Sequence, residues 1–99
     1  MARALPGRRR PVVSSVKGQL GHAEGAAAAL EAVLAVRAMT EGFIPGNVTL
    51  REPDPACGGI DLVEPEGRRT PVRAVLNQAF GFGGGVSTVL LGRVDDGAA

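Results

Sequence analysis

The segment from Ala23 to Thr40 constrains the fold of this chain more than any other. Its central part, A-A-A-A-L-E-A-V-L-A-V, would be apolar on almost every face of a helix, and Glu31 interrupts it. Gly42 then provides a stop signal, with Pro45 beyond it. A helix that is apolar all round is normally buried all round. Because a small sheet covers only one face, the sequence predicts a helix enclosed by more protein than these 99 residues provide.

Composition narrows the class of protein. The apolar run is interrupted too soon, and by a charge, for a membrane span. A net charge of +1 gives no bulk bias toward nucleic acid or membranes, and 3% aromatic residues leave few stacking surfaces for bases or sugars. The single cysteine excludes an internal disulfide framework and is compatible with a reducing cytoplasm. We therefore expect a cytoplasmic α/β protein.

The rest of the chain divides into short extended segments and one hairpin. We expect a flexible basic segment at 1–10, one partial domain at 11–94 and a disordered tail at 95–99. The expected strands are Val12–Val13, Ile60–Val63, Arg73–Phe80 and Val86–Val94, the last two being antiparallel neighbours joined by a glycine turn. Residues 43–50 form a Pro/Gly-interrupted extended segment, and residues 64–71 are charged and rich in turn formers.

A strand that passes through a glycine-bearing turn into a helix lies between Val12 and Glu31. The first N–H groups of a helix are unpaired and carry positive potential, so this junction is a common place for a site. It holds the only lysine, Lys17, on the turn, and the only histidine, His22, at the helix start. There the imidazole tends to remain neutral near pH 7 and to donate through one ring nitrogen. Taken alone, the two residues are also compatible with an ordinary role, His22 as a helix cap and Lys17 as a solvated side chain.

The complete pattern resembles a known family. V-S-S-V-K-x-x-x-G-H-x-x-G-A-A, followed by N-Q-A-F-G-F-G-G-G, is similar to the C-terminal part of a beta-ketoacyl synthase, the condensing enzyme of fatty-acid and polyketide assembly. The resemblance covers Pro11 to Val94. It implies a βαββ portion of the thiolase-like fold, from the C-terminal half, incomplete relative to the full two-half enzyme.

The resemblance also implies roles for individual residues. His22 would hydrogen-bond the malonyl thioester carbonyl and stabilise the enolate formed on decarboxylation, as an oxyanion hole does. Lys17 and Glu31 would form a pair that supports it. The substrate-binding and gating loop of the family corresponds to Phe80, Phe82, Gly83 and Gly84, with Phe82 as the gate.

Other family features are absent or altered. The family's nucleophilic cysteine and a further histidine lie upstream of the matched segment. Cys57 lies in a Pro/Gly loop rather than at a helix N-terminus, so we interpret it as incidental. Gly85-Val86 replaces a Thr-Asn pair that is common in the family, and Gly18 replaces Ser or Ala. Such changes are compatible with a divergent or inactive member.

The resulting hypothesis is an acyltransferase fragment, inactive without its cysteine-bearing half. Its implied partners are an N-terminal ketosynthase half or subunit and acyl carrier protein, within a dimer, and it would use no metal or cofactor. One alternative is a non-catalytic chain-length-factor-like partner or remnant. Another is a small basic nucleic-acid-binding protein that uses Arg8, Arg9 and Arg10.

Overall fold

The structure is a computed structural model that describes residues 10–94. The expected tail at 95–99 lies outside the described residues, as does the expected basic segment except for Arg10. The described chain divides into two units. We call residues 10–21 with 44–68 the lysine unit, and residues 22–43 with 69–94 the helix–hairpin unit.

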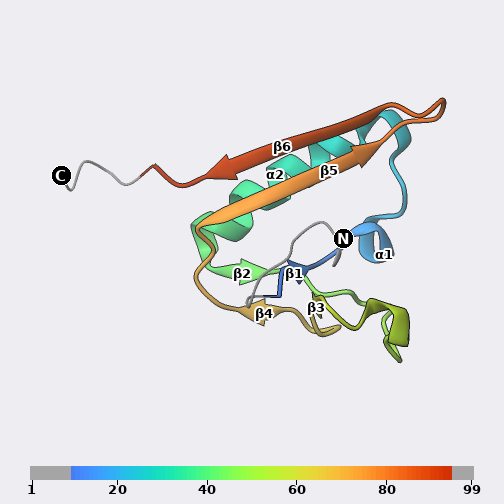
Figure 1. The fold of residues 1–99 in the computed structure, drawn as a ribbon. Helices are drawn as coiled ribbons and strands as arrows, with labels where there is room; N and C mark the ends of the chain where they lie inside the picture. The colour runs from blue at the N-terminus through green and yellow to red at the C-terminus, as the bar shows by residue number, and fades with distance from the viewer. Residues whose placement is uncertain (1–9, 95–99) are drawn as a thin grey trace. The chain divides into compact units, whose positions relative to one another are not determined.

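The helix–hairpin unit contains the long helix and the antiparallel hairpin that the sequence predicts, and both predictions are confirmed. A 3-10 turn, η1 (Glu24–Ala26), leads into α2 (Ala27–Glu41). The strands β5 (Ala74–Phe80) and β6 (Val86–Gly92) form the antiparallel hairpin that lies along α2 in Figure 1. Gly42 ends α2 in the left-handed conformation, with a φ of 64°, and its N–H donates to the Ala38 carbonyl at 2.9 Å.

One face of the hairpin packs on one face of α2. Asn77 of β5 donates from Nδ2 to the Ala28 carbonyl at 3.1 Å, which places the face of β5 that carries Asn77 toward the helix. On α2, the buried residues are Ala35, Ala38 and Met39. Their small or flexible side chains let the strands approach closely, so the unit is a two-layer α/β structure.

The outer faces of these two layers are apolar and exposed. On α2, Leu30, Val33 and Val36 are 44%, 61% and 48% exposed. On the hairpin, the cross-strand pairs Leu76–Leu90 and Phe80–Val86 lie on the face opposite Asn77. As predicted, the strands described here cover the apolar helix on one side only.

The lysine unit is built from short elements joined by loops. These are β1 (Val12–Val13), α1 (Lys17–Leu20), η2 (Pro55–Cys57) and β3 (Asp61–Leu62). β1 and β3 pair in parallel, with Val12 opposite Asp61 and Val13 opposite Leu62. Val63 is fully buried next to this pair. A further short sheet pairs β2 (Phe43–Ile44) with β4 (Arg68–Arg69), and each of these strands has one residue in each unit.

The structure differs from the sequence predictions in three places. The βαββ arrangement is not confirmed, because the strands between residues 10 and 94 form two-stranded sheets in which β1 pairs with β3. Lys17 begins the one-turn helix α1 instead of lying on an open turn. The third difference is β4, which the sequence did not predict because two adjacent arginines show no apolar alternation. Within the described part of the chain, no helix is long and apolar enough to cross a membrane.

Candidate functional site

His22 lies just before the first helical turn of its unit, as the sequence predicted. Its Nδ1 accepts a 2.9 Å hydrogen bond from the backbone N–H of Glu24. This bond requires a lone pair on Nδ1, so the neutral imidazole carries its proton on Nε2. His22 is exposed, and its geometry makes Nε2–H the donor of the ring. Such a donor suits a carbonyl or an enolate oxygen.

Glu24 adopts an unusual backbone conformation beside this imidazole. Its φ is 50°, and among residues 10–94 no other non-glycine residue has a positive φ. The left-handed region costs a non-glycine residue roughly 1–2 kcal/mol. The sequence carries no signal for this conformation. The N–H of Glu24 holds His22, so the residue with the unusual φ also donates the hydrogen bond that fixes the tautomer.

Glu31 and Lys17 occupy separate units. Glu31 lies near the start of α2 in the helix–hairpin unit and is half-buried. Lys17 opens α1 in the lysine unit, where its carbonyl accepts the Gly21 N–H at 2.9 Å. The predicted pairing of Lys17 with Glu31 stays a prediction.

The glycine turn between β5 and β6 presents the aromatic residues of the predicted gate. The Phe82 side chain is fully exposed and Phe80 is 72% exposed. Gly83 and Gly84 have φ values of 91° and 93°, conformations that L side chains rarely adopt. The loop is closed by a 2.6 Å bond from the Gly81 N–H to the Gly85 carbonyl. Phe82 is therefore followed by two residues whose backbone conformation favours glycine. The gating role of Phe82 stays a prediction.

The best-defined ion pairs of the lysine unit surround Arg68. Its guanidinium donates to both Asp61 oxygens, at 2.7 and 2.9 Å, and to both Glu64 oxygens, at 2.6 and 3.1 Å. These hydrogen bonds hold the pKa of Asp61 and the pKa of Glu64 below their ordinary values. Asp61 belongs to β3 and Arg68 to β4, so these ion pairs connect the two ends of the loop between β3 and β4. We therefore assign them a structural role.

Cys57 does not lie at a helix N-terminus, which is where a nucleophilic thiolate is stabilised. It is the last residue of η2, so its thiol lies at the end of a short helix and not at the N-terminus. A cavity of about 700 Å³ next to it is lined by residues between Pro53 and Leu62, Cys57 among them, and by Arg10. Within residues 10–94, no group of three or more His, Cys, Asp or Glu side chains could hold a metal ion.

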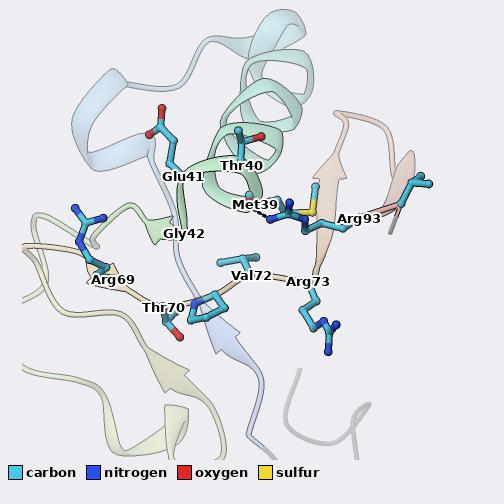
Figure 2. Close-up of a pocket in the computed structure, with 11 residues that line it drawn as sticks. Met39, Thr40, Glu41, Gly42, Arg69, Thr70, Val72, Arg73 and Arg93 are labelled. Carbon is cyan, nitrogen blue, oxygen red and sulfur yellow. Dashed lines mark hydrogen bonds between the residues drawn. The ribbon is translucent and has the colours of Figure 1, made fainter. Parts of the chain in front are cut away.

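A groove of about 730 Å³ lies at the C-terminal end of α2, and its arginines do not converge on it. In Figure 2, the guanidinium of Arg93 reaches the end of the helix, where it donates to the Met39 carbonyl at 3.1 Å. Arg69 lies over the Phe43 ring, with 5.8 Å between its guanidinium carbon and the ring centroid. Arg73 points away from both in Figure 2. Arg69 and Arg93 therefore make separate structural contacts and do not form one binding site with Arg73.

Two asparagines with clear positioning contacts were not singled out from the sequence. Asn77 holds β5 on α2 through the Ala28 carbonyl. Asn47 contacts three backbone groups of the lysine unit. The available signals were that Asn47 follows a Pro-Gly pair and that Asn77 is a polar residue within a predicted strand.

Comparison with known proteins agrees with the family that the motifs indicate. The model of the family described as beta-ketoacyl synthase, C-terminal domain, matches residues 1–51. This match places the chain in the class of ketosynthase C-terminal domains. More particularly, the chain belongs to the beta-ketoacyl synthase family.

The chain is similar to synthases of both fatty-acid and polyketide type. It is 42% identical over 84 residues to 3-oxoacyl-[acyl-carrier-protein] synthase 2 of Coxiella burnetii, covering 85% of this chain and 20% of that protein. It is 40% identical to the chloroplastic synthase II of Arabidopsis thaliana, over 79% of this chain and 14% of that protein. A Streptomyces coelicolor protein named as an actinorhodin polyketide beta-ketoacyl synthase 1 is 41% identical, over 84% of this chain and 18% of its own length. The chain thus spans about a fifth or less of these relatives.

Proposed function

We propose that this chain is the part of a beta-ketoacyl synthase that binds and activates the malonyl group. The single observation that carries the proposal is the hydrogen bond from the Glu24 N–H to His22 Nδ1, which leaves Nε2–H as the donor. The proposed reaction is a decarboxylative condensation of an enzyme-bound acyl thioester with a malonyl thioester on acyl carrier protein.

A fixed neutral donor is the group that this reaction needs. When the malonyl carboxylate leaves as CO₂, the electron pair of the broken C–C bond forms an enolate, and negative charge develops on the thioester oxygen. A preorganised N–H aimed at that oxygen stabilises the transition state more than the ground state. The enolate carbon then attacks the acyl thioester and displaces the thiolate of the complementary half.

The exposed apolar surface of α2 supports the requirement for a complementary half. Leu30, Val33 and Val36 lie on the first turns of the helix that His22 precedes. Exposed clusters of this kind mark surfaces that are covered by other protein. Since the relatives are several times longer, we propose that their remaining part covers this face and brings the nucleophilic cysteine. In that complete protein, β1, α2, β5 and β6 would form the βαββ portion of the thiolase-like fold.

The remaining residues take supporting roles in this proposal. Lys17 and Glu31 would provide electrostatic support for the histidine donor. Phe82 would swing on its glycine turn to open the acyl pocket, with Phe80 beside it, because glycine backbones rotate where other residues are blocked.

The experiment is reconstitution of a two-part enzyme. The chain is co-expressed with the portion of the Coxiella burnetii synthase that it does not match, and ketoacyl product is measured from acyl and malonyl thioesters of acyl carrier protein. We expect product only when both parts are present, and a loss of about 100-fold or more with His22→Ala. Product from this chain alone, or unchanged activity of His22→Ala in the pair, would contradict the proposal.

A further inference from the structure

We infer that Asn47 is a positioning residue that sets the backbone from which Lys17 projects. The inference rests on the proposed function, in which Lys17 supports the histidine donor. Asn47 lies in the Pro45-Gly46-Asn47 segment after β2, far from Lys17 in sequence but in the same unit.

The oxygen and the nitrogen of the Asn47 carboxamide both bond backbone groups. Two of these groups belong to the segment that leads to Lys17, and the third follows β3. Oδ1 accepts the Ser15 backbone N–H at 2.9 Å. Nδ2 donates to the Val13 carbonyl at 3.1 Å and to the Val63 carbonyl at 2.9 Å. One side chain therefore joins the end of β1 to the residue after β3, and it also holds the backbone of Ser15, two residues after β1.

The backbone around Asn47 holds the same segment at two more points. Ser14 donates from its hydroxyl to the Pro45 carbonyl, and Gln19 donates from Nε2 to the Gly46 carbonyl at 3.1 Å. Lys17 lies between Ser15 and Gln19, so it is bracketed by contacts on both sides. Pro45 and Gly46 make these contacts through their carbonyl groups, whereas Asn47 bonds the segment through its side chain.

These contacts set the direction in which Lys17 leaves the backbone. After Ser15, the chain turns directly into α1, where the Leu20 N–H bonds the Val16 carbonyl at 3.0 Å. A four-residue helix is too short to hold its own shape, so its orientation depends on how the chain enters it. Releasing Ser15 therefore lets α1 fray and Lys17 move, whereas loss of an apolar contact elsewhere in the unit lowers stability only.

Amide hydrogen exchange of the intact chain tests this difference. The first measurement uses the wild type. Ser15 is exposed and lies outside helices and strands, so its amide should exchange at the unstructured rate unless Asn47 protects it. We expect protection of tenfold or more. Exchange of Ser15 at the unstructured rate overturns the inference, and this result does not depend on whether any variant folds.

The second measurement compares Asn47→Ala with Val63→Ala, a matched control. Val63 is fully buried in the same unit, and its truncation keeps the backbone carbonyl that Asn47 bonds. Asn47→Ala should speed exchange at Ser15, Leu20 and Gly21 at least tenfold more than at the reference amides Ile60 and Gly67, which have turn bonds of their own. Val63→Ala should speed both groups alike. Equal changes in both groups with Asn47→Ala would show a purely structural role and overturn the inference.

The two-part enzyme separates this inference from the proposed function. If the pair is active, Asn47→Ala should lower kcat at least tenfold, and Val63→Ala should leave it nearly unchanged below the melting transition. Full activity of Asn47→Ala would overturn the positioning of Lys17 while the proposed function stands. If the wild-type pair is inactive, the proposed function fails, and the exchange data alone decide whether Asn47 fixes the turn.

Discussion

The backbone N–H of Glu24 points at Nδ1 of His22, at 2.9 Å, from a residue whose φ is 50°. The imidazole is therefore held by a peptide group that a non-glycine residue places only at a cost. The backbone conformation of Glu24 therefore helps to decide which ring nitrogen of His22 carries the proton.

Substitutions at Glu24 should separate the strain from the hydrogen bond. Glycine adopts a positive φ freely, so Glu24→Gly should keep the N–H in place and keep the Nε2–H tautomer. Valine is much less compatible with this conformation, so Glu24→Val should lower the free energy of unfolding by about 1–2 kcal/mol and mix the two tautomers. Long-range ¹H–¹⁵N spectra of the single histidine, in mildly alkaline buffer, report the tautomer. A pure Nε2–H signal in Glu24→Val would contradict the link.

Gly46 should not tolerate a side chain. A Cβ at this position would overlap the carbonyl oxygens of Pro65 and Glu64, which are backbone atoms and cannot rotate away. We expect Gly46→Ala to lower the free energy of unfolding by about 3 kcal/mol, measured by urea denaturation. Gly25→Ala is the control, because a Cβ there meets no atom within 4 Å, and its effect should stay below about 1 kcal/mol. Equal stability of the two variants would show that the loop yields easily.

Arg68 should make the lysine unit sensitive to acid. Its hydrogen bonds lower the pKa of Asp61 from the ordinary 3.8 and the pKa of Glu64 from the ordinary 4.5. Because the folded values lie below the unfolded ones, the pairs stabilise the fold above about pH 5, and this contribution is lost as the pH falls through the lowered values.

Arg68→Gln should therefore lower the melting temperature more at pH 6 than at pH 3. The effect should be modest and should shrink in high salt, because the side chains of Asp61 and Glu64 are 40% and 47% exposed. Arg51→Gln, at an exposed position of the same unit, controls for the loss of one positive charge. A loss at pH 3 as large as the loss at pH 6 would show that these carboxylates are not responsible.

The exposed face of α2 should matter for assembly and little for the stability of the isolated chain. Val33 is 61% exposed, so Val33→Gln should change the free energy of unfolding by no more than about 0.5 kcal/mol. The same change should weaken binding of the complementary half at least tenfold, measured by titration calorimetry or gel filtration of the pair. Glu41→Gln, which places the same side chain at the polar end of the same helix, should bind normally. Normal binding by Val33→Gln would place the interface elsewhere.

Local patterns were sufficient for the largest elements. The apolar run around Glu31 predicted α2, and Gly42 predicted its end, because both signals act within a few residues along the chain. The two strand-forming runs at 73–80 and 86–94 predicted the hairpin, with the glycine turn from Gly81 to Gly85 between them. The motifs with Lys17 and His22 were specific enough to indicate the family, which the comparisons confirm.

The sequence by itself thus determined the helix, the hairpin, the family and the apolar surface that needs a cover. Tertiary structure alone decided the left-handed Glu24, the pairing of β1 with β3, and the three contacts of Asn47. The reason is physical. Periodicity reports which residues share a face of one element, whereas a carboxamide bonded to Val13, Ser15 and Val63 depends on segments that meet only after the chain has folded.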